Sequence, residues 1–142
     1  MDKIVSLAIG SIAGGLCRWL LSEAIARAVG DRFPYGTLAV NLSGCFIIGL
    51  LYGLGETRFA LSSQGRLLLM VGFCGAFTTF SSWMLETSVL LDQGHAARAY
   101  AYVLGSVLVG FTLFRAGTVL PKTVWAPSVG AESALRVAPD QP

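Results

Sequence analysis

The chain has 142 residues, of which 54% are hydrophobic and 13% are charged, and its mean hydropathy is +0.68. A soluble domain carries about 25% charged residues, so this composition excludes an ordinary soluble protein and indicates an integral membrane protein. The net charge of +2, with no basic block in the sequence, also gives no indication of nucleic-acid binding.

Four apolar segments are long enough to cross a bilayer, which takes about 20 helical residues. We expect the spans at about Ile4 to Val29, at Tyr35–Gly55, at Leu67–Leu85 and at about Ala97 to Leu120. The first is expected to be an uncleaved membrane helix and not a signal peptide, because Arg18 interrupts its apolar region. Residues 1–120 should therefore form one four-helix membrane domain, and the proline-rich residues 121–142 a disordered tail.

Polar side chains inside the first two spans are costly in a bilayer and are therefore candidate functional residues. Arg18 is either an electropositive element near an anion path, or a structural charge that pairs with Glu23 or caps helix-end carbonyls. Asn41 shares a helical face with Thr37 and Gly44. Its amide either serves a site at membrane depth or forms a hydrogen bond that joins two helices.

The third span contains the unusual run "GFCGAFTTFSSW", from Gly72 to Trp83. Its two glycines and two threonines weaken a helix and predict a break. The carbonyls freed by a break are either bonded by nearby hydroxyls or offered to a hard cation such as Na⁺ or K⁺. Phe80 and Trp83 lie one turn apart, and their ring edges either contact an anion or only pack the bundle.

The fourth span carries Tyr102, Ser106 and Gly110 along one helical face. The two hydroxyls either bind a permeant species or bond to another helix. The three cysteines lie in apolar segments without metal-site spacing and are expected to be inert buried thiols (Cys17, Cys45 and Cys74). Since the sequence holds a single histidine and no catalytic or nucleotide-binding motif, we expect a protein that is not an enzyme.

The distribution of basic residues indicates how the chain inserts. Lys and Arg near the span ends number four on the side of the termini (Lys3, Arg58, Arg66, Lys122) and three on the other (Arg27, Arg32, Arg98). So small a bias predicts insertion in both orientations. Glycines at helical spacing, Gly10/Gly14 and Gly49/Gly53, predict close approach of helices.

Three segments, "GGLCRW", "YGTLAVNLSGCFIIG" and "GFCGAFTTFSSWMLE", together resemble the signature segments of the bacterial fluoride channels of the Fluc or CrcB family, over about Ile4 to Leu120. The resemblance implies an all-α integral membrane protein with four transmembrane helices, the third of them broken. Such proteins form antiparallel dual-topology homodimers in the bacterial cytoplasmic (inner) membrane. Two narrow pores would export fluoride passively, and a structural Na⁺ at the dimer interface would not be transported.

The same resemblance implies roles for individual residues. The carbonyls of Gly75 and Thr78 would hold the sodium. The fluoride pore would be lined by Asn41, Phe80, Trp83, Tyr102 and Ser106, with Arg18 as an electropositive or structural residue. Two positions depart from the family, because Trp83 stands where phenylalanine is usual and Gly110 where a hydroxyl residue is usual. The indole is larger but adds an N–H donor, and the glycine predicts a weaker fluoride site or a water there.

Two other classes of protein are alternatives at this point. A small multidrug-resistance transporter also has four helices and dual topology, but it needs a buried carboxylate for proton exchange, and the first span offers only Glu23 near its end. A membrane scaffold without transport activity would tolerate Asn41→Ala and Phe80→Ala without any change in the fluoride sensitivity of the host.

Overall fold

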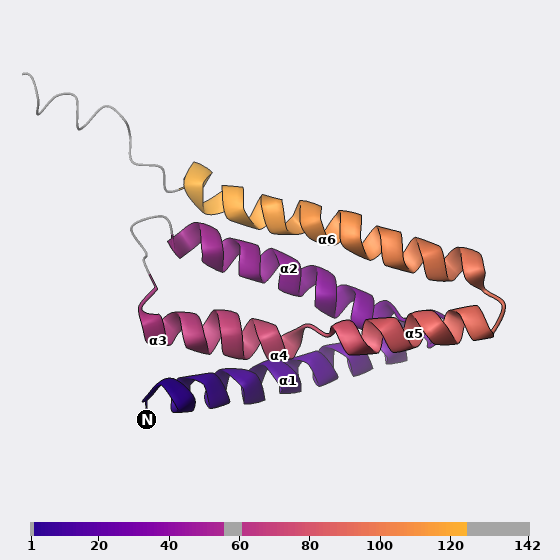
Figure 1. Ribbon diagram of the computed structural model, residues 1–142, viewed down its shortest axis with the longest axis horizontal. Coiled ribbons are helices and arrows are strands. Elements are labelled where there is room, and N and C mark those ends of the chain that lie inside the picture. The colour runs from indigo at the N-terminus through magenta and orange to yellow at the C-terminus, as the bar shows by residue number, and fades with distance from the viewer. Residues whose placement is uncertain (1, 56–60, 125–142) are drawn as a thin grey trace, which may run out of the picture.

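The computed structural model describes residues 2–55 and 61–124, and all the regular structure in these ranges is helical. Three helices are continuous: α1 (Asp2–Val29), α2 (Tyr35–Gly55) and α6 (Ala96–Val124). The third pass is divided into α3 (Ser63–Arg66), the π-helix η1 (Leu67–Cys74), α4 (Gly75–Phe77) and α5 (Phe80–Asp92). The passes lie side by side in an elongated bundle, and the start of α1 and the end of α6 lie at the same end (Figure 1).

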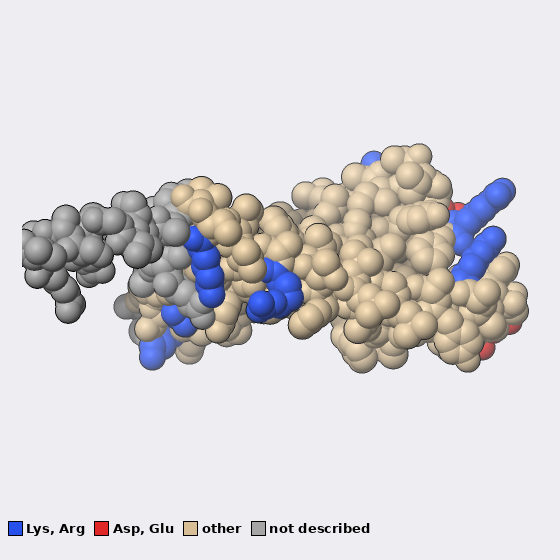
Figure 2. Space-filling model, turned by 90° about the horizontal axis from the view of Figure 1, so that it is seen from above, with Lys and Arg blue, Asp and Glu red and all other residues tan. Residues whose placement is uncertain are grey.

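Four helical passes within the described ranges are long and apolar enough to cross a membrane, including Ser63–Asp92 taken as one pass. Lys and Arg side chains gather toward the two ends of the molecule, and the surface between them is largely uncharged on the face shown in Figure 2. The chain is therefore a multi-pass membrane protein, as its composition predicts.

The third and fourth passes are longer than predicted. The third begins at Ser63, where the hydroxyl of Ser62 accepts a hydrogen bond from the N–H of Gly65 at 3.1 Å, and it ends at Asp92. The fourth continues through the buried Pro121 to Val124, four residues beyond the boundary expected for the tail. The rest of the predicted tail, residues 125–142, lies outside the described residues.

Glycines bring the helix backbones of this one chain into contact. A Cβ atom added at Gly10 or Gly14 of α1 would collide with backbone carbonyls of η1. A Cβ atom added at Gly49 or Gly53 of α2 would collide in the same way with carbonyls of α6. The predicted close approach of helices is therefore confirmed, and it occurs within the chain.

Helical geometry is interrupted between α4 and α5. Thr78 has φ/ψ of −81°/157° and Thr79 has −147°/118°, so both residues are extended. Figure 1 shows this short stretch midway along the third pass. Because lipid offers no hydrogen bonds at this depth, the backbone groups of the interruption need partners within protein.

Candidate functional site

Hydroxyl side chains cap both helix ends at the interruption. α4 ends at Thr78 because the backbone there is extended, and the Oγ1 and the N–H of Thr78 both donate to the carbonyl of Cys74, at 2.9 and 3.0 Å. Thr79 begins α5, since its Oγ1 accepts from the N–H of Ser82 at 3.2 Å and donates to the Ser82 hydroxyl at 3.1 Å. The Thr79 hydroxyl replaces the missing backbone acceptor of the Ser82 N–H, as Thr does at the start of a helix. The run "TTFSS" therefore stops one helix and starts the next.

Asn41 of α2 ties the interruption to the bundle. Its Nδ2 donates to the Thr79 carbonyl at 2.9 Å, and its Oδ1 accepts from the Thr79 N–H at 2.8 Å. These two hydrogen bonds join α2 to the third pass, which is one of the two alternatives that the sequence indicated for Asn41. An amide NH₂ group has two N–H donors, and the contact with Thr79 uses one of them. The other N–H leaves Asn41 able to serve a ligand as well.

This bonding takes the α-helical partners away from two carbonyls. In an uninterrupted α-helix each N–H bonds to the carbonyl four residues earlier. The Thr79 N–H would then bond to Gly75, but it is donated to Asn41. The Ser82 N–H would bond to Thr78, but it is donated to the Thr79 hydroxyl. The carbonyls of Gly75 and Thr78, which the family resemblance assigns to a cation, thus lose their helical donors.

A cavity of about 310 Å³ adjoins the interruption, and its lining includes Asn41, Gly75, Thr78 and Phe80. Gly75 is exposed, and a Cβ atom there would meet no other atom within 4 Å. Phe80 is 70% exposed. Exposed backbone at membrane depth is unfavourable against lipid, so this face of a single chain lacks a suitable cover.

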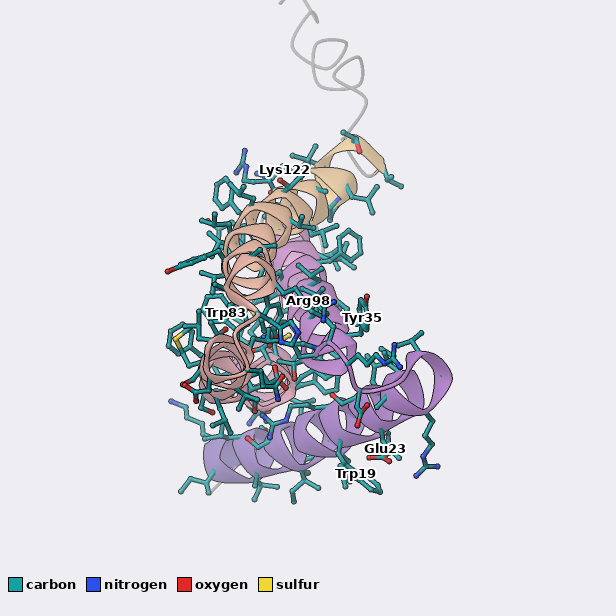
Figure 3. The ribbon with its side chains drawn as sticks, turned by 90° about the vertical axis from the view of Figure 1, so that its right-hand side faces the viewer. Trp19, Glu23, Tyr35, Trp83, Arg98 and Lys122 are labelled. Carbon is teal, nitrogen blue, oxygen red and sulfur yellow. The ribbon has the colours of Figure 1, made fainter. Side chains whose placement is uncertain are left out.

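Trp83 differs from Phe80 in burial, although the two rings lie 5.2 Å apart on α5. Trp83 is 9% exposed and makes an edge-on contact with Tyr102 at 6.3 Å between ring centroids. Its indole N–H donates to Oγ of Ser106 at 3.2 Å. Figure 3 shows Trp83 between α5 and α6. The extra donor expected of the indole is therefore already bonded to α6.

Glu86 joins three helices through its carboxylate. Its Oε1 accepts from the Thr37 hydroxyl of α2 at 2.6 Å, and its Oε2 accepts from the Tyr102 hydroxyl of α6 at 2.8 Å. Tyr102, expected to offer its hydroxyl to a permeant species, donates to a carboxylate in this structure. The sequence predicted that the third span ends at Leu85, just before Glu86, and it indicated no role for Thr37. Both residues could have been identified from spacing, because Thr37 shares a helical face with Asn41 and Glu86 lies one turn beyond Trp83.

A second cavity, of about 440 Å³, has Thr37 and Glu86 in its wall. It lies where α1 ends and α2 begins, and Glu23 and Tyr35 line it as well. Figure 3 looks onto this end of the bundle, with Glu23 and Tyr35 on α1 and α2. The hydrogen-bonded Thr37 and Glu86 therefore lie in the wall of a cavity at this end of the bundle.

The charges of α1 differ from one expectation. Glu23 pairs with Arg27, Nε to Oε1 at 3.3 Å, so the alternative in which Glu23 pairs with Arg18 is wrong. The side chains of Arg27 and Glu23 are 76% and 44% exposed, so this is a surface pair. Glu23 is not the buried carboxylate that a small multidrug-resistance transporter needs. Arg18 lies half-buried on the same helix.

Gly110 lies against a cysteine. It is buried, and a Cβ atom added there would lie 3.3 Å from Sγ of Cys45 on α2. The position that the family usually fills with a hydroxyl is thus next to a thiol. The three cysteines are free, but the prediction that they are buried holds only for Cys74, because Cys45 is half-buried and Cys17 is exposed.

Comparison with known proteins identifies relatives over nearly all of the described chain. The model of a family described as "CrcB-like protein, Camphor Resistance (CrcB)" matches residues 5–118. A protein of Maridesulfovibrio salexigens is 40% identical over 87% of this chain and 98% of its own length. Proteins of Chlorobaculum tepidum and Solibacter usitatus are 42% and 43% identical over 86% and 84% of this chain, and over 96% and 98% of their own lengths. All three relatives are named "Fluoride-specific ion channel FluC".

Proposed function

The chain belongs to the CrcB family, and we propose that it is a fluoride-specific ion channel that lets fluoride leave the cytoplasm passively. The names of its relatives support this function. The structural observation that carries it is the Asn41 amide, which holds the interruption by one N–H and lines a cavity beside the exposed ring of Phe80. Neutral donors and ring edges bind a small anion without holding it as a full counter-charge would.

In the proposed mechanism, fluoride sheds most of its water on entering a narrow path. The lost hydrogen bonds are replaced by the remaining N–H of Asn41, by hydroxyls and by aromatic ring edges. Chloride is larger and is excluded by the width of the path. The residues assigned to the pore are Asn41, Phe80, Trp83, Tyr102 and Ser106, and Arg18 supplies positive potential nearby. Flow follows the electrochemical gradient and lowers cytoplasmic fluoride that entered as HF.

Tyr102 and Glu86 give this path a particular feature. The Tyr102 hydroxyl is held by a carboxylate oxygen at 2.8 Å. Fluoride is also a strong hydrogen-bond acceptor, so it would bind this hydroxyl by taking the place of the carboxylate oxygen. Glu86 therefore competes with fluoride for the proton of this hydroxyl.

The proposed assembly is an antiparallel dual-topology homodimer. The nearly even Lys and Arg count is what insertion in both orientations requires. The exposed Gly75 and Phe80 and the adjoining cavity need a protein cover at membrane depth, and a second copy provides it. A two-fold axis would bring the same patch of each copy together.

A structural Na⁺ at this interface fits the chain. The carbonyls of Gly75 and Thr78 have lost their helical donors, and carbonyl oxygens are suitable ligands for a hard cation. Two copies would supply four such oxygens. When bound, the ion supplies positive charge that satisfies these oxygens, and it is not transported. The bacterial cytoplasmic membrane is the proposed location, with fluoride resistance as the benefit to the cell.

The test is anion efflux from proteoliposomes. Vesicles that contain the protein and are loaded with fluoride should release it when the membrane potential is collapsed by a potassium ionophore. Matched vesicles loaded with chloride should keep their anion. Equal release of the two anions, or release no faster than from protein-free vesicles, would reject the proposal. A scaffold predicts the latter result.

A further inference from the structure

The contact between Trp83 and Ser106 shows which of the two side chains donates the hydrogen bond. An indole Nε1–H only donates, whereas a serine hydroxyl has one proton to donate and lone pairs that accept. The Trp83 N–H donates to Ser106 Oγ at 3.2 Å, so Ser106 is the acceptor in this bond. The proton of the Ser106 hydroxyl is therefore left for another acceptor.

Other hydroxyls of α6 show the usual destination of such a proton. Thr112, Thr118 and Thr123 each donate to a carbonyl three or four residues earlier, at 2.7 to 2.9 Å. Within residues 2–55 and 61–124, the hydrogen bond found for the Ser106 side chain is the one from Trp83. Ser106 thus differs from the threonines of its own helix in keeping its proton free of the backbone.

The neighbouring donors along the α5–α6 contact are already occupied. Tyr102 donates its hydroxyl to Glu86, and Trp83 donates its N–H to Ser106. One turn beyond Ser106 stands Gly110, which has no side chain. Among the four residues Trp83, Tyr102, Ser106 and Gly110, Ser106 is the one with a side-chain proton to spare.

We propose that Trp83 is a positioning residue that holds Ser106 as a hydrogen-bond donor to the permeant anion. This inference rests on the proposed channel function. The indole itself is fixed by its contacts with Phe80 and Tyr102. By filling an acceptor position of the Ser106 oxygen, its N–H polarises the hydroxyl and strengthens it as a donor. Trp83 therefore acts on fluoride through Ser106, and not by offering its own N–H.

The Trp83→Phe variant tests this because it keeps an aromatic ring and removes the N–H. The Ser106 hydroxyl should then turn to the carbonyl of Tyr102, four residues earlier, as the threonines of α6 turn to theirs. Fluoride efflux should fall roughly tenfold, near the low end of what one hydrogen bond to a charged group contributes. Ser106→Ala should cause a fall of similar size.

A double-mutant cycle separates action through Ser106 from an independent effect of the ring. Trp83→Phe combined with Ser106→Ala should be no slower than either single variant. A product of the two losses, about a hundredfold for two tenfold effects, would overturn the inference. Thr112→Ala is the matched control, because the Thr112 hydroxyl is bonded to the Leu108 carbonyl at 2.8 Å, and it should run at the wild-type rate.

A spectroscopic readout keeps the inference testable if Trp83→Phe does not fold. The indole N–H resonance of Trp83 can be assigned in ¹H–¹⁵N spectra by replacing the other two of the three tryptophans. Fluoride should shift it in the wild type and not in Ser106→Ala. If the wild type passes fluoride but this resonance does not respond, or if Trp83→Phe is as fast as the wild type, the inference fails while the channel function stands. A wild type that passes no fluoride defeats the channel function itself.

Discussion

Replacing Asn41 by leucine should weaken both the fold and the interruption of the third pass. The change keeps the number and branching of the side-chain heavy atoms and removes two hydrogen bonds to Thr79, of 2.9 and 2.8 Å. Each bond contributes about 1 kcal/mol, and a buried polar group left without a partner costs about 1–3 kcal/mol. The Thr79 N–H can return to the Gly75 carbonyl, but the Thr79 carbonyl loses its donor. We therefore expect a loss of about 2–4 kcal/mol in the free energy of unfolding.

The assay is unfolding in a denaturing detergent, followed by circular dichroism. Ser43→Ala on the same helix is the matched control, because the Ser43 hydroxyl bonds to its own helix at the Val40 carbonyl, at 3.1 Å, and its loss should change stability by less than about 0.5 kcal/mol. Because the second N–H of Asn41 is also proposed to bind fluoride in the pore, Asn41→Leu should lose fluoride efflux as well. If Asn41→Leu unfolds at the same detergent concentration as Ser43→Ala and keeps wild-type efflux, the account of the interruption is refuted.

Further predictions concern the carboxylate, the glycines and the cation. Glu86→Gln should lower the free energy of unfolding by about 2 kcal/mol, because the single amide oxygen cannot replace both carboxylate oxygens as acceptors of the Thr37 and Tyr102 hydroxyls. An unchanged unfolding midpoint would contradict this. Gly49→Ala should cost about 1–3 kcal/mol because its Cβ collides with the Phe114 carbonyl. Gly75→Ala should leave the single chain as stable as before but reduce dimerisation, measured by cross-linking; an unaffected dimer would count against a partner at this face. Exchanging Na⁺ for N-methylglucamine should reduce both the dimer fraction and fluoride efflux, and no response of either would count against a structural cation.

The four membrane passes could be predicted from the sequence because apolar run length decides them. The third pass was predicted to end at Leu85, where the uncharged run meets Glu86, and this end lies too early. In the structure this carboxylate is bonded to two hydroxyls inside the bundle, and Thr87 returns its own hydroxyl to the Trp83 carbonyl at 2.7 Å. Polar groups satisfied in this way do not end a membrane helix.

The candidate residues could be predicted from the sequence, but their partners could not. Spacing along one helix shows which side chains share a face, as it did for Thr37 and Asn41. Spacing does not show what that face meets. Asn41 meets the backbone of Thr79, 38 positions away, and the Trp83 N–H meets Ser106 across 23 positions. These pairs depend on the packing of α2 and α6 against the third pass, which no local pattern contains.

The central claim is selective passage of fluoride, and the most direct measurement is the ratio of fluoride to chloride efflux from proteoliposomes of the wild-type protein. The proposed function predicts rapid fluoride release with chloride release no faster than from protein-free vesicles. Equal release of the two anions, or no release of fluoride above that of protein-free vesicles, would contradict it.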